Sequence, residues 1–124
     1  MENHNPPLFD STLLPDNLGV EDSATLVDIY SSYLAQLDTL AEVFARPGDP
    51  DSNCNEIQAS AHKFKSSSLA VGASRLSHWL KLLEASALDK TPELKAIFSS
   101  TILQIQPTRD AVKLEITRLQ ESPQ

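Results

Sequence analysis

The spacing of apolar residues constrains the fold of this 124-residue chain more than any other feature. Apolar side chains recur at intervals of three and four along four segments, which is the period of an amphipathic α-helix. No segment shows the sustained alternation of a half-buried β-strand, and the chain contains only three glycines. The pattern predicts an all-α protein, an antiparallel four-helix bundle with short connections.

Capping and helix-breaking residues set the expected boundaries. The four predicted helices cover residues 23–46, 52–71, 73–88 and 91–120. Asp22 is a good N-cap for the first helix, and Asn53 with Glu56 has the form of a capping box for the second. The first helix should end at Pro47, and Pro107 inside the fourth predicts a kink or a short break.

The length fits one domain, because a chain of this size can bury one core. Residues 1–21 are predicted to form an N-terminal segment, with a flexible tail over residues 1–10. A short helical turn around Leu13, Leu14 and Leu18 should follow the tail. Residues 22–121 should form the bundle itself.

The composition favours a cytoplasmic protein. No apolar run approaches the ~20 residues that a membrane-spanning helix needs, so no direct membrane insertion is expected. The first seven residues have neither basic residues nor an apolar stretch, which argues against a signal peptide. The single cysteine, Cys54, excludes an internal disulfide and fits a reducing compartment. We expect a monomer in the cytoplasm.

The charge is unevenly placed along the chain. A net charge of −7 argues against nucleic acid as the main partner. Residues 57–83 nevertheless contain four cations and no Asp or Glu; these cations are Lys63, Lys65, Arg75 and Lys81. Such a basic stretch favours docking of an acidic or phosphorylated protein. Chance clustering of charges on two helices is the alternative.

One face of the second predicted helix carries the candidate chemistry. Spacings of three and four place five residues on this face: Gln58, His62, Lys65, Ser66 and Leu69. A lone histidine in a helix is most often structural or merely exposed. Three features favour a function for His62: Lys65 one turn away, small serines at positions 66–68, and Glu84 within reach on the antiparallel third helix.

Glu84 and Lys65 could each assist chemistry at His62. A Glu84 carboxylate that accepts from Nδ1–H would fix the tautomer of His62 and leave Nε2 as a nucleophile. Lys65 could offset the charge of a phosphoryl group, and phosphoryl transfer depends mainly on positioning and electrostatics. His78 lacks these surroundings and is interpreted as a helix-surface residue, while His4 lies in the tail. No metal site is expected, since no metal-ligand spacing includes His62.

The same stretch resembles the histidine-containing phosphotransfer (HPt) family, whose pattern is His-x-x-Lys-Gly-x-x-x-x-x-Gly. His62, Lys65 and Gly72 match the pattern in identity and spacing, whereas Ser66 stands where the family most often has glycine. Glu84 falls where members carry a polar residue that hydrogen-bonds the active histidine. The resemblance extends over residues 22–120. Residues 65–68 and 108–111 are also similar to free-standing HPt proteins of quorum-sensing relays.

The resemblance implies a phosphocarrier rather than an enzyme. His62 would accept a phosphoryl group from an aspartate in the receiver domain of a hybrid sensor kinase and pass it to a response regulator. Partner contacts are expected from Gln58, Lys63, Ser66 and Leu69, and Gly72 should end the helix. Mg²⁺ would be held by the receiver alone, and the glycines do not form a phosphate-binding loop, so no cofactor or ATP site is expected. The alternative is a helical adaptor that binds a receiver or kinase domain without being phosphorylated.

Overall fold

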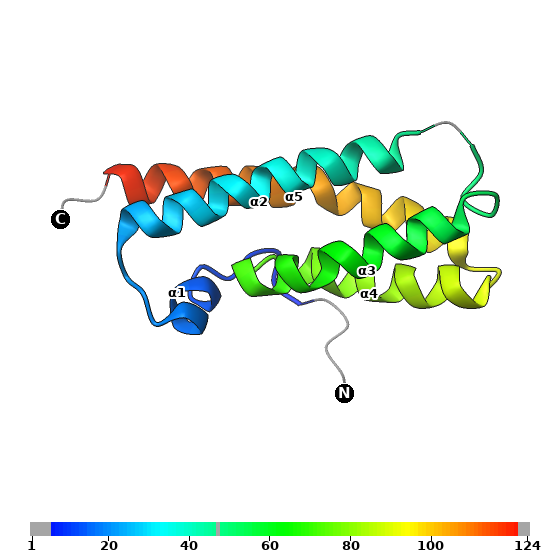
Figure 1. Ribbon diagram of the computed structural model, residues 1–124, viewed down its shortest axis with the longest axis horizontal. Helices are drawn as coiled ribbons and strands as arrows, with labels where there is room; N and C mark the ends of the chain where they lie inside the picture. The colour runs from blue at the N-terminus through cyan, green and yellow to red at the C-terminus, as the bar shows by residue number, and fades with distance from the viewer. Residues whose placement is uncertain (1–5, 47, 122–124) are drawn as a thin grey trace.

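A computed structural model of the protein describes residues 6–46 and 48–121. These residues form helices and connections without a strand, which confirms the all-α prediction. The helices are α1 (Leu13–Leu18), α2 (Ser23–Phe44), α3 (Cys54–Val71), α4 (Ser74–Asp89) and α5 (Leu94–Glu121). The four long helices run antiparallel along one axis, and α1 lies at the end where α2 begins (Figure 1).

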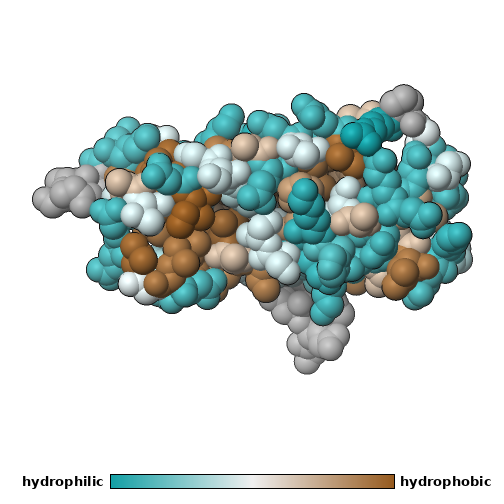
Figure 2. Space-filling view, viewed as in Figure 1, coloured by the Kyte–Doolittle hydropathy of each residue, from teal (hydrophilic) through white to brown (hydrophobic). Residues whose placement is uncertain are grey.

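The bundle is two layers of two helices, with α2 beside α5 and α3 beside α4 (Figure 1). The predicted apolar stripes face inward and supply fully buried residues from each layer, among them Leu40, Leu76, Leu80 and Val112. The core also contains a polar contact between side chains, where the hydroxyl groups of Tyr33 and Ser68 lie 2.6 Å apart. This contact joins α2 to α3. Figure 2 shows that apolar side chains reach the surface at the end occupied by α1, where Leu18 is 47% exposed.

Asp22 caps α2 as the sequence predicts. Its carboxylate accepts hydrogen bonds from the backbone N–H and the hydroxyl of Thr25. The expected capping box at the start of α3 does not form, because Asn53 makes no side-chain capping bond. Glu56 instead accepts from Arg46 at 2.7 Å across the connection between α2 and α3. Pro47, expected to end the first helix, lies outside the described residues.

The last helix differs from the sequence prediction at its start and in its middle. It begins at Leu94, and the preceding Thr91-Pro92-Glu93 form a turn. The sequence predicts a kink or a short break at Pro107; the helix is continuous there, so the break is wrong. Proline removes the hydrogen bond to the carbonyl of Leu103, but both residues lie on the exposed face, where water can reach that carbonyl.

The N-terminal segment packs against the bundle over the part that the structure describes. Residues 6–10 were expected in a flexible tail; instead, Asp10 donates its backbone N–H to the carbonyl of Gly72 at 2.8 Å. Phe9 lies edge-on to Tyr30 with ring centroids 5.8 Å apart. A Cβ on Gly72 would lie 2.1 Å from the carbonyl oxygen of Asp10, so glycine is what allows this approach. The rest of the predicted tail, residues 1–5, lies outside the described residues.

Candidate functional site

The apolar stripe of α3 decides which of its side chains face water. Residues Ile57, Ala61 and Phe64 point into the core, and this turns the adjacent face of the helix outward. His62 lies on that outward face with 67% of its side chain exposed. An imidazole in this position is open to a large partner, and its helix is held in place by the core beneath it.

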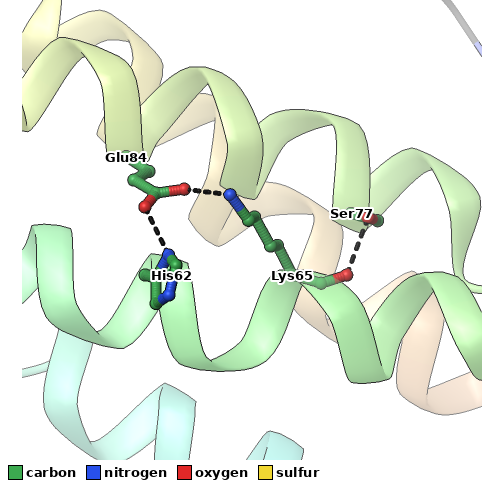
Figure 3. A network of polar contacts seen from close by, with 4 residues as sticks. All are labelled: His62, Lys65, Ser77 and Glu84. Carbon is green, nitrogen blue, oxygen red and sulfur yellow. Dashed lines mark hydrogen bonds and ion pairs between the residues drawn. The ribbon is translucent and has the colours of Figure 1, made fainter.

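The structure brings together three of the predicted site residues. Nδ1 of His62 lies 2.6 Å from Oε2 of Glu84, and Nζ of Lys65 lies 2.5 Å from Oε1 of the same carboxylate (Figure 3). Glu84 comes from α4, which packs antiparallel to α3. One carboxylate therefore bridges the histidine and the lysine, and the rest of the imidazole ring points away from it.

The electrostatics of this cluster favour one form of the ring. The hydrogen bond from Lys65, and after it the one from His62, hold the pKa of the Glu84 carboxyl below its usual range, so the group is ionised at neutral pH. An ionised carboxylate can only accept hydrogen bonds. Nδ1 must then carry the proton, which leaves the lone pair of a neutral imidazole on Nε2.

The other predicted site residues surround this cluster without joining it. Ser66 and Leu69 are exposed, and Gln58 is half-buried on the same helix. The ammonium of Lys63 lies 5.5 Å from the ring centroid of Phe64, a cation–π contact that holds it beside α3. Gly72 follows the last residue of α3 in a left-handed conformation with φ of 98°.

A residue that the sequence did not point to also contacts the site. Ser77 of α4 is buried, and its hydroxyl donates to the backbone carbonyl of Lys65 at 2.8 Å (Figure 3). The sequence contains one indication of this contact: Ser77 precedes Glu84 by seven residues. Seven residues are about two helical turns, so both side chains lie on the same side of α4. That spacing is common to many helical residues and does not single out a contact.

The remaining candidates lie apart from the cluster. The ring of His78 lies edge-on to its neighbour Trp79, with centroids 6.1 Å apart. Within residues 6–46 and 48–121, no three His, Cys, Asp or Glu side chains gather closely enough to hold a metal ion. In the same part of the chain, no helix combines the length and apolar character of a membrane span. His4 lies outside the described residues.

The fold and this cluster define the class of protein: an antiparallel helical bundle in which His62 is exposed beside Lys65. The family model of the Hpt domain matches residues 24–122, which is most of the chain. The chain therefore belongs to the Hpt domain family, whose members carry phosphoryl groups in two-component signalling, interact with receiver domains and lack a catalytic ATP site. Neither curated proteins nor solved structures give a significant match to it.

Proposed function

We propose that His62 is the phosphorylated residue of a relay. It accepts a phosphoryl group from an aspartate in the receiver domain of a hybrid sensor kinase and passes it to the aspartate of a response regulator. The observation that carries this proposal is the contact of Nδ1 with Glu84, on a ring that is otherwise exposed. Nδ1 is thereby occupied, and Nε2 is the nitrogen that a partner can reach.

The transfer step follows from this arrangement. The Nε2 lone pair attacks the phosphorus of the receiver's aspartyl phosphate, a P–N bond forms, and the P–O bond to the aspartate breaks. The bonding electrons leave with the aspartate as a carboxylate. The imidazole becomes positively charged while Nδ1 keeps its proton, so the negative charge of Glu84 stabilises the product. The return step is the reverse, with a second receiver as acceptor.

Lys65 and the surrounding face support the same step. The ammonium of Lys65, one turn from His62, offsets part of the charge on the phosphoryl group. Gln58, Lys63, Ser66 and Leu69 form the surface on which a receiver would rest. The acidic pocket of a receiver also holds the Mg²⁺ that the step requires, so this chain needs no cofactor of its own.

The basic stretch of α3 and α4 supports this partner. Lys63 and Lys81 are exposed, and residues 57–83 contain no carboxylate, although the chain as a whole has a net charge of −7. An acidic receiver is attracted to that stretch and repelled elsewhere, which raises the rate of correctly oriented encounters.

The test is phosphorylation by a receiver domain that has itself been phosphorylated with a small acyl phosphate. His62→Gln should abolish labelling and leave the melting temperature nearly unchanged, because the side chain is mostly exposed. His78→Gln is the matched control and should be labelled like the wild type. Labelling that persists in the His62 variant would refute the proposal, as would labelling of the isolated wild-type chain by ATP and Mg²⁺.

A further inference from the structure

The hydroxyl of Ser77 bonds to a different helix, whereas several other hydroxyls bond within their own helix. A serine or threonine inside a helix commonly bonds to the carbonyl one turn earlier in the same helix. Threonines that do so here are Thr39, Thr101, Thr108 and Thr117. Ser77 instead donates across the helix interface, from α4 to the carbonyl of Lys65 on α3.

Ser77 and Glu84 give α4 two separate contacts with the site helix. They lie about 10 Å apart along α4, since each residue adds 1.5 Å. Ser77 holds the backbone of α3, whereas Glu84 contacts the side chains of His62 and Lys65. Side chains of glutamate and lysine have several rotamers and can follow a moving helix. The serine side chain has a single torsion and its bond ends on the backbone of α3, so this contact ties the position of that helix to α4 more directly.

The position of α3 matters because the reaction requires exact alignment. A displacement of about 1 Å in a reacting group can cost about a hundredfold in rate. We propose that Ser77 is a positioning residue for phosphoryl transfer. Its hydrogen bond holds α3 at the place along α4 where Glu84 meets Nδ1 of His62. The kinetic part of this inference rests on the proposed function of His62, but the state of the ring is measurable without phosphate.

The test compares Ser77→Thr with Ser77→Val, which have nearly the same shape and differ in the hydroxyl. The measurement is the set of ¹⁵N and ¹H chemical shifts of the His62 ring, recorded for all variants at the same alkaline pH. Wild type and the threonine variant should show one tautomer, with the proton on Nδ1. The valine variant should show a mixture of two tautomers, and its transfer rate from a phosphorylated receiver should fall about tenfold.

Ser86→Ala is the matched control. Ser86 is also buried on α4, but its hydroxyl pairs with Thr91 and not with α3. This variant should keep the ring shifts and the transfer rate of the wild type.

Ser77→Ala removes the same hydroxyl without adding methyl groups, so it should reproduce the valine result if the lost hydrogen bond is the cause. A single Nδ1–H tautomer and a wild-type rate in the alanine variant would overturn the inference. If wild-type His62 accepted no phosphoryl group, the proposed function would fail, and the ring shifts would still decide the role of Ser77.

Discussion

The carboxyl group of Glu84 has a lower pKa than an ordinary glutamate. The hydrogen bonds from Lys65 and His62 lower its pKa, in that order of importance. A carboxyl whose pKa is lower in the folded protein stabilises the fold at every pH above its unfolded value of about 4.3. That stabilisation is lost as the pH falls through the folded pKa. It is complete at neutral pH.

Glu84→Gln should therefore lower the free energy of unfolding at about pH 7, by up to about 1 kcal/mol because the pair is partly exposed. The difference from the wild type should shrink once the pH falls below about 4.3 and vanish below the folded pKa. Urea unfolding of both proteins at neutral and acidic pH measures it. A difference that stays constant down to about pH 2 would show that the charge of Glu84 does not contribute.

In the proposed docking arrangement, Ser66 should determine how closely a partner can approach His62. It is exposed one turn further along α3, on the face proposed for docking. Ser66→Trp should leave the fold intact but reduce transfer strongly in both directions, because added bulk separates the two surfaces. Ser66→Gly should preserve or improve transfer at a cost of about 0.5 kcal/mol in helix stability. Transfer rates and melting curves measure both effects, and a wild-type rate in the tryptophan variant would place the docking surface elsewhere.

At the level of the helices, the turn after α3 depends on Gly72 for two reasons. Its φ of 98° is unfavourable for other residues, and a Cβ would clash with the backbone of Asp10. Gly72→Ala should lower the free energy of unfolding by about 3 kcal/mol or more. Gly19 has a comparable φ of 66° but open space around it, so Gly19→Ala should cost only about 1 kcal/mol. Urea unfolding compares the two, and equal losses would mean that the contact with Asp10 contributes nothing.

Local patterns predicted the helices, and they predicted that Glu84 lies within reach of His62. Antiparallel neighbours joined by a short connection have a nearly fixed register, so residues at matching distances from the turn meet. The sequence did not predict the bond from Ser77 to Lys65, because a contact between a side chain and a distant backbone leaves no periodic signal. The packing of residues 6–10 escaped prediction because it depends on contacts with residues far along the chain, the backbone of Gly72 and the ring of Tyr30.

Two failures have a different cause. Asn53 and Glu56 satisfy the local rule for a capping box, but Arg46, which follows α2 in the connection to α3, binds Glu56. Pro107 satisfies the local rule for a helix break, yet the packing of the residues on either side keeps α5 continuous. On either side of the exposed proline, Ile105 and Thr108 are buried in the core. In both places a tertiary contact outweighs a local preference.

Considered as a whole molecule, the bundle has a core that contains two tyrosines of α2. Tyr30 is 0% exposed and Tyr33 is 2% exposed. Burial, together with the negative charge of Glu115, raises the pKa of Tyr30 to about 12. Burial also raises the pKa of Tyr33, although its hydrogen bond with Ser68 acts in the opposite direction. The folded state therefore favours neutral tyrosines, and the stability this gives is lost as the pH rises from the unfolded value of about 10 toward the folded one.

The protein should accordingly lose stability in alkali. The free energy of unfolding should fall by up to about 1.4 kcal/mol per pH unit for each tyrosine between about pH 10 and 12. Tyr33→Phe removes one of the two groups. It should be less stable at neutral pH by about 1 kcal/mol, because Ser68 loses its partner, but should show a shallower alkaline slope. Denaturant unfolding across this range measures the slopes, and equal slopes would contradict the prediction.

The sharing of Glu84 between His62 and Lys65 has a consequence for the energy of the phosphorylated protein. The single positive charge of Lys65 is already matched by Glu84 before a phosphoryl group arrives. In the proposed reaction the ring would gain one positive charge and the phosphoryl group would bring two negative ones, so the net charge of the cluster would change only from zero to about −1. Because Lys65 is shared with Glu84, its attraction for the phosphoryl group is reduced, and the phosphohistidine should remain able to pass the group on. We expect exchange with a receiver to be reversible, so that the direction of flow is set by the relative amounts of the two partners.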